Sequence, residues 1–181
     1  MPAFIALLRS INVGGRNLIS MEALRGVFHG LGYASAKTLL QSGNVVFPAS
    51  GVRTETLAAQ LETAIETAAG FRPVVVVLAR PELDRVVRAN PFAGRTFEPS
   101  RLLVLFPAAA PVAGAEAALR AAHDGPEEFH LAAGALYVHY VDGVARSKLT
   151  TARIEKALGV PVTGRNWNTA LKLQTLAAEL G

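Results

Sequence analysis

The first eighty residues alternate between short apolar runs and longer segments in which apolar residues recur every three or four positions. The runs predict strands, and the recurrence predicts amphipathic helices. The predicted order is strand, helix, strand, strand, helix, strand, which is the ferredoxin-like βαββαβ arrangement. In chain order the segments are AFIALL at 3–8, a helix over 21–31, AKTLLQ at 36–41, NVVFP at 44–48, a helix over 54–69 and PVVVVLA at 73–79.

The ends of these two helices carry ordinary capping signals. Ser20 and Thr54 stand where an N-cap hydroxyl would accept a backbone hydrogen bond, and Gly32 and Gly70 stand where each helix would end. The segment QSGN at 41–44 separates the two short strands with residues that favour a tight hairpin turn. These local signals agree with the predicted order of elements.

The same pattern starts again after residue 100. A linker at 81–100 holds a short helix with Pro81 in its first turn, and the strand RLLVLF follows at 101–106. Next in chain order come a small helix over 115–122, a hairpin over 127–143 that turns at Ala133 and Gly134, a helix over 150–159, a short strand at 160–164 and a last helix from about 168. We therefore expect an α+β protein of two tandem ferredoxin-like halves, 1–80 and 101–181, packed together with an extra C-terminal helix.

Alternation along the predicted hairpin assigns its side chains to two faces of the second sheet. One face carries Phe129, Leu131, Leu136 and Val138, and the other carries Glu128, His130, Tyr137 and His139. We therefore expect the second sheet to have a polar, partly aromatic open face. The strands of the first half are apolar on both faces, so their sheet needs cover on each side, from the second half, the linker helix or another subunit.

Composition narrows the class of protein. Of the 181 residues, 51% are hydrophobic and 18% are charged, which excludes a disordered chain. The absence of cysteine excludes disulfides, thiolate metal sites and cysteine nucleophiles. The apolar N-terminus stops at Arg9, too early for a signal peptide, and no apolar run has the length of a membrane span. We expect a cytoplasmic protein with no membrane partner, and we leave its oligomeric state open.

The segment RSINVGGRN at 9–17 is the first candidate binding motif. The backbone N–H groups of Gly14 and Gly15 can converge on an anion at positive φ, with Arg9 or Arg16 adding charge. The segment lacks the Gly-Lys-Ser/Thr end of a nucleotide-binding P-loop and the GxGxxG of a dinucleotide fold. The alternative is a glycine turn that lets the chain leave its strand. A net charge of +4 favours anionic partners only mildly.

Two further motifs lie in the second half. ARSKL at 145–149 places Arg146 and Lys148 at a helix entrance, where cations oppose the helix dipole, and this indicates an anion held nearby. GRNWNT at 164–169 combines Arg165 with two asparagines, of which Asn166 or Asn168 is a natural N-cap. In each case the alternative is an ordinary capping or packing role.

The four histidines show no metal-binding spacing such as HExxH, and we expect no metal site and name no cofactor. Glu128 opposite His139, with His130 nearby, is the one cluster that could act as a metal or acid–base site. No GxSxG nucleophile elbow and no RNA-recognition signature is present.

The motifs taken together resemble a known family. Six motifs follow one another along the chain: ALLRSINVGG, LLQSGNVVF, NPF, ARSKL, EKALG and TGRNWNTALKL. In this order they look like the motifs of the bacterial domain of unknown function family 1697. The resemblance implies a small cytosolic protein with two α+β subdomains and no established activity. The family usually has Gly where this chain has Ser10, which suggests that this position does not require a glycine conformation.

The matching motifs supply the candidate ligand-binding residues. They are Arg9, Asn12, Gly14, Gly15, Ser42, Asn44, Arg146, Lys148, Arg165, Asn166 and Asn168. Our first hypothesis is that they bind a small anionic ligand, phosphate-bearing or nucleotide-like, at the junction of the two halves. The alternatives are a small enzyme that uses the same pocket, with Lys148 as its reactive group, binding of single-stranded nucleic acid by stacking on Tyr137, and a purely structural role.

Overall fold

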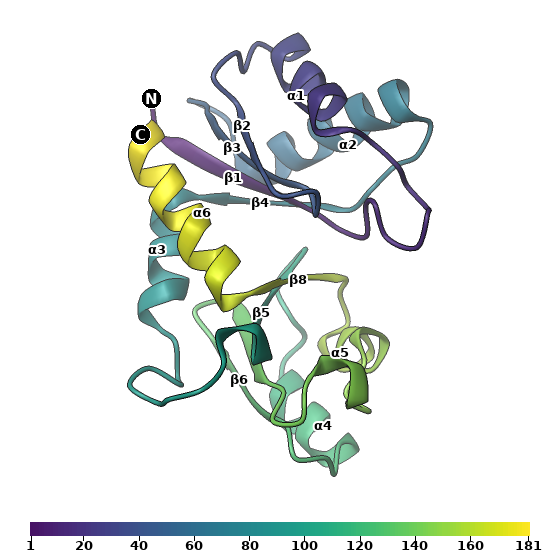
Figure 1. The fold of residues 1–181 in the computed structure, drawn as a ribbon, viewed down its shortest axis with the longest axis vertical. Coiled ribbons are helices and arrows are strands. Elements are labelled where there is room, and N and C mark those ends of the chain that lie inside the picture. The colour runs from purple at the N-terminus through teal and green to yellow at the C-terminus, as the bar shows by residue number, and fades with distance from the viewer. The chain divides into compact units, whose positions relative to one another are not determined.

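The computed structural model describes residues 1–181, and the chain divides into two compact units (Figure 1). Unit 1 consists of Met1–Asp84 and Lys172–Gly181, and unit 2 consists of Arg85–Leu171. Both boundaries fall inside helices, α3 (Arg80–Arg88) and α6 (Trp167–Leu180). The C-terminal residues from Lys172 onward therefore group with unit 1, although the sequence pattern placed the whole last helix in the second half.

Unit 1 has the predicted ferredoxin-like arrangement. Its four strands form an antiparallel sheet in the order β2-β3-β1-β4, and the chain visits them as βαββαβ. The elements are β1 (Ala3–Leu8), α1 (Met21–Gly30), β2 (Lys37–Leu39), β3 (Asn44–Pro48), α2 (Thr54–Ala69) and β4 (Val75–Ala79). In Figure 1 the helices α1 and α2 lie together over one face of this sheet.

Unit 2 repeats the arrangement, with the sheet order β6-β7-β5-β8. Its elements are the 3₁₀ helix η1 (Pro99–Arg101), β5 (Leu102–Pro107), α4 (Ala115–Ala122), β6 (Glu128–Ala132), β7 (Ala135–His139), the 3₁₀ helix η2 (Val144–Arg146), α5 (Thr151–Leu158) and β8 (Val162–Asn166). The prediction of two tandem ferredoxin-like halves followed by a C-terminal helix is confirmed. No helix of the structure combines the length and the apolar character that crossing a membrane requires.

Local capping chemistry explains most of the helix ends. Ser20 Oγ accepts a hydrogen bond from Ala23 N at 3.0 Å, and Gly70 ends α2 with φ 76°, in the left-handed region that favours glycine. The predicted cap of α2 is wrong by one position. Thr54 is the first helical residue, and Arg53, which precedes it, makes no side-chain capping bond.

The sheet of unit 1 is covered on both faces, as its apolar strands require. One face packs against α1 and α2 through a cluster that includes Leu24, Phe28, Leu57, Leu61 and Phe47. The other face receives the C-terminal part of α6. Gly181 lies against Ala3, and Gln174 Nε2 donates to Asp84 Oδ1 at 2.8 Å, which joins α6 to α3.

The second sheet differs from the prediction on one face. Its inward residues, such as Phe129 and Val138, pack against α4 and α5 as expected, and Ala133 and Gly134 form the hairpin turn. The opposite face is open only in part, because His130 is exposed as predicted but Tyr137 is fully buried and His139 is 9% exposed.

Tyr137 and His139 are covered by the chain segment that begins at Arg85, the first residue of unit 2. Tyr137 donates its hydroxyl to Val86 O at 2.5 Å, and the rings of Phe92 and Phe97 lie 5.9 Å and 5.4 Å from that of His139. Tyr137 is therefore unavailable for stacking on a nucleic-acid base, and that predicted role is wrong.

Candidate functional site

The candidate residues of unit 1 lie on two adjoining segments, the loop after β1 and the turn between β2 and β3. Asn12 Nδ2 donates to Ile19 O at 3.0 Å and to Gln41 O at 2.9 Å, while its Oδ1 accepts from Ile19 N at 2.9 Å. Asn44 is fully buried and donates to Leu39 O and Ser42 Oγ. The amide of Asn12 therefore holds the two segments together, whereas the amide of Asn44 fixes the β2–β3 turn internally.

The glycine pair has the backbone conformation that the sequence predicted. Gly14 and Gly15 have φ of 59° and 74° and are exposed at the tip of a small hairpin closed by the Val13–Arg16 bridge. Ser10 has φ 54°, so the expectation that its position requires no glycine conformation is wrong. A convergence of these loops with the unit 2 residues stays a prediction.

The candidate residues of unit 2 separate into two groups. Arg165 is 7% exposed and donates to Thr163 Oγ1 and to Gly164 O, both at 2.8 Å, and burial lowers its pKa to about 10. Asn166 Oδ1 accepts from both Thr169 N and Thr169 Oγ1 at 2.9 Å, which makes it the capping residue of α6, while Asn168 is exposed.

Arg146 and Lys148 do share a recess, which we call the loop recess. It has a volume of about 480 Å³, and Arg165 is not among its lining residues. The loop recess is lined by Asp124, Gly125, Pro126, Glu127, Asp142, Arg146 and Lys148. Three carboxylates face two cations there, so this recess is a poor site for an anion.

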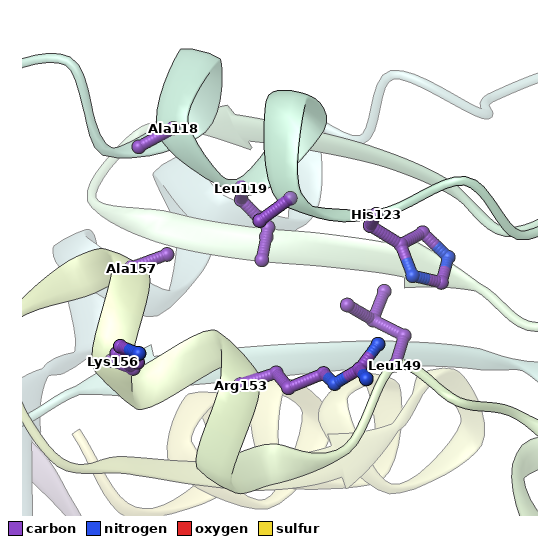
Figure 2. A pocket seen from close by; sticks show the side chains of 8 residues that line it. Ala118, Leu119, His123, Leu149, Arg153, Lys156 and Ala157 are labelled. Atoms are coloured by element: carbon purple, nitrogen blue, oxygen red, sulfur yellow. The ribbon is translucent and has the colours of Figure 1, made fainter.

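A second recess of unit 2, the α4–α5 groove, was not found from the sequence (Figure 2). Its volume is about 400 Å³, and it is lined by Ala118, Leu119, Ala122, His123, Leu149, Arg153, Lys156 and Ala157. Arg153 and Lys156 lie one helical turn apart on α5, and neither has an ion-pair partner within the chain. The groove thus joins an apolar wall from α4 to two unpaired cations and one histidine.

The histidine at the end of the groove belongs to a buried pair. His123 Nε2 lies 2.6 Å from Glu127 Oε2, and the two side chains are only 2% and 4% exposed. Burial works to raise the pKa of Glu127, but hydrogen bonds from Ser147, from its own backbone N–H and from His123 together lower it. Glu127 is therefore a carboxylate that accepts the Nε2–H of His123, which leaves Nδ1 as the acceptor nitrogen of the neutral ring.

His123 Nδ1 is the one buried side-chain polar atom of the chain without a hydrogen-bond partner. Gly125 lies directly against the pair, since a Cβ at this position would come within 2.3 Å of Glu127 Oε2 and 2.6 Å of His123 Nε2. Ser147, which bonds Glu127, also accepts from Leu149 N at 2.9 Å. The ARSKL motif is thereby connected to the groove through Ser147 and Leu149.

Sequence reasoning missed this site for a physical reason. His123 and Glu127 are four residues apart, but α4 ends at Ala122, so helical periodicity does not apply to the pair. The signal that could have been used is the i, i+3 spacing of Arg153 and Lys156 on a predicted helix. No group of three or more side chains of the kind that bind metals is arranged to hold a metal ion.

Comparison with known proteins supports the fold and leaves the activity open. A family model described as a protein of unknown function (DUF1697) matches residues 1–137. No curated protein matches the sequence. The solved structure of the conserved bacterial protein SP0830 from Streptococcus pneumoniae is similar, with a TM-score of 0.74 and 19% sequence identity over 97% of this chain and 98% of that chain.

Proposed function

The chain belongs to this family of proteins of unknown function, and we propose that its second unit binds a small anionic ligand in the α4–α5 groove. The ligand class is a carboxylate or phosphate monoester that carries a short hydrocarbon part. The observation that carries the proposal is the pair of unpartnered cations, Arg153 and Lys156, on the rim of a largely apolar recess. The sequence also led us to expect a small anionic ligand, but a phosphate-bearing or nucleotide-like one, bound by other residues at the junction of the two halves.

The groove is suited in size and composition to such a molecule. A recess of about 400 Å³ lies within the range of small-molecule sites. The two cations can each donate charge-assisted hydrogen bonds to one anionic group, because residues three apart on a helix project from the same side. Ala118, Leu119 and Ala157 offer the apolar surface that a hydrocarbon part would cover.

The test is a titration of ¹⁵N-labelled protein with butyrate and with inorganic phosphate at constant ionic strength, followed by amide chemical shifts. We expect butyrate to perturb residues on α4 and α5. The double variant Arg153→Gln/Lys156→Gln should bind it at least about tenfold more weakly, because a tenfold loss is about 1.4 kcal/mol, within the worth of one charge-assisted hydrogen bond.

The matched control is Arg146→Gln/Lys148→Gln, which removes the same two charges from the loop recess. It should leave butyrate binding within about twofold of the wild type, because long-range charge effects are screened by salt. Equal losses in the two double variants, or no perturbation of α4 and α5 in the wild type, would contradict the proposal.

A further inference from the structure

We infer that His123 Nδ1 is a hydrogen-bond acceptor for the ligand of the α4–α5 groove, so that the groove selects anions that also carry a hydroxyl group. The inference rests on the proposed function and adds a second recognition element to it. The ligand class becomes a hydroxy acid or a hydroxyalkyl phosphate.

The hydrogen bond between His123 and Glu127 fixes the roles of the two ring nitrogens of the imidazole. A neutral histidine has one donor nitrogen and one acceptor nitrogen, and the bond made by one fixes the role of the other. Nε2 faces the Glu127 carboxylate at 2.6 Å, so it carries the proton. Nδ1 is left with a lone pair and no donor in reach.

The Nδ1 edge of the His123 ring faces the α4–α5 groove. Glu127 lines the loop recess and not the groove, whereas His123 lines the groove and not the loop recess. The Nε2 edge of the ring is therefore turned away from the groove, and the Nδ1 edge is turned toward it. Figure 2 shows one ring nitrogen on the side of Leu149 and the Arg153 guanidinium, at the end of the groove, and the other turned away from them.

The absence of a hydrogen-bond donor to Nδ1 carries a cost in free energy. A buried acceptor without a donor has lost its bond to water and gained nothing in exchange, so such atoms are rare and call for an explanation. The rest of the local network is satisfied, because Ser147 bonds Glu127 and Leu149 N, and Tyr140 donates its hydroxyl to Leu149 O. A donor supplied by a bound molecule would complete it.

A ligand in the groove can reach His123 Nδ1 only past the side chain of Leu149. Leu149 is 2% exposed and lies beside His123 on the groove wall, so its side chain covers Nδ1. A ligand hydroxyl reaches Nδ1 when this leucine changes rotamer, a motion confined to one side chain. The cations of α5 would hold the anionic end of the same molecule.

The experiment compares butyrate with 2-, 3- and 4-hydroxybutyrate in the titration already described. We expect at least one hydroxyl isomer to bind roughly tenfold more tightly than butyrate, the gain from one well-placed hydrogen bond to a buried acceptor. In ¹⁵N spectra of the imidazole, Nδ1 of His123 should be unprotonated in the free protein and should shift when that isomer binds.

The matched variant is Gly125→Ala, which changes neither member of the pair but places a Cβ in the space they occupy. It should remove the preference for the hydroxyl isomer while leaving butyrate binding nearly unchanged. The ¹⁵N measurement on the wild type does not depend on whether this variant folds.

The outcomes separate the two proposals. Binding of butyrate with no gain from any hydroxyl isomer, or a proton found on Nδ1 of the free protein, would overturn this inference and leave the proposed function standing. Failure of all four acids to bind would overturn both. Retention of the hydroxyl preference in a folded Gly125→Ala protein would also contradict the assigned role of the pair.

Discussion

The two units carry the same kind of recess in the same place but line it with different chemistry. In unit 1 the recess between α1 and α2 has a volume of about 420 Å³, and the α4–α5 groove of unit 2 has about 400 Å³. The unit 1 recess is lined by Ala23, Gly26, Val27, Gly30, Leu31, Ala64, Thr67 and Ala68, none of which is charged. The fold therefore provides the recess, whereas the side chains at its rim determine which ligand it can take.

The units also differ in where the backbone is held in rare conformations. Unit 1 has four residues other than glycine at positive φ, namely Ser10, Asn12, Asn17 and Leu40, whereas unit 2 has one, Ala133. Such conformations persist only where the surroundings impose them. In unit 1, Asn17 Nδ2 donates to Ser10 O within the loop after β1, and Asn12 Nδ2 donates to Gln41 O in the β2–β3 turn.

The largest expected effect compares equivalent hairpin turns of the two units. Gly43 and Gly134 have φ of 75° and 81°, but only at Gly43 would a Cβ meet neighbours, Leu8 Cβ at 2.8 Å and Ile11 Cδ1 at 2.7 Å. We expect Gly43→Ala to lower the free energy of unfolding by about 3 kcal/mol, from backbone strain together with overpacking. Gly134→Ala should cost about 1 kcal/mol, from backbone strain alone.

Urea denaturation of the two variants measures both losses. Leu8 Cβ is attached to a buried strand and cannot move aside as the tip of Ile11 can, so the contact at residue 43 will not be relieved cheaply. Equal losses at the two turns would mean that the added Cβ at residue 43 is accommodated without overpacking.

A second prediction is that two cations introduced into the recess of unit 1 will enable it to bind butyrate. Ala64 and Thr67 are three residues apart on α2, as Arg153 and Lys156 are on α5. The variant Ala64→Arg/Thr67→Lys should therefore give unit 1 a measurable affinity for butyrate, with amide shifts on α1 and α2. We expect this affinity to be several-fold weaker than that of unit 2, because two carboxylates, Glu62 and Glu66, lie on the same helix as the introduced cations.

The uncharged variant Ala64→Gln/Thr67→Gln is the control for changes in shape. If the charged variant folds and binds no better than this control, two cations at the rim are insufficient. The affinity of unit 2 would then depend on further groove residues.

Local chemistry made much of the fold predictable. Glycine adopts positive φ easily and turns depend on neighbouring residues, so such features can be predicted locally. The structure has the predicted helix ends at Gly70 and Gly159 and the predicted turn at Ala133 and Gly134. Arg146 and Lys148, which are close in sequence, do share a recess, but it is the loop recess and not the α4–α5 groove.

Features that depend on contacts far apart in the chain were not predictable. Tyr137 looked exposed because alternation assigns a residue to a face but cannot say what covers that face, here the backbone of Val86. The α4–α5 groove depends on two helices that are adjacent only in the folded unit. The His123–Glu127 pair spans the end of one helix, where neither helical nor strand periodicity applies.

The smallest expected effect concerns surface ion pairs, which the two units arrange differently. In unit 1, Arg72 divides its bonds between Glu62 and Glu66, whereas in unit 2, Arg95 donates to both oxygens of Glu128 at 2.8 Å. The hydrogen bonds from Arg95 are the main cause that lowers the pKa of Glu128 to about 2, with His139 adding to the effect.

A carboxyl group with a lowered pKa in the folded state stabilises the protein above its unfolded pKa. The stabilisation from Glu128 should therefore be complete above about pH 4.5 and should be lost as the pH falls toward 2. Arg95→Met should flatten the fall in stability over this window, by a small amount because both side chains are largely exposed. Glu128→Gln should flatten it slightly more, because it also removes the contribution of His139, and Arg95→Met should add nothing to it. An additive effect in urea denaturation from pH 5 to pH 2 would assign the acid sensitivity to other carboxyl groups.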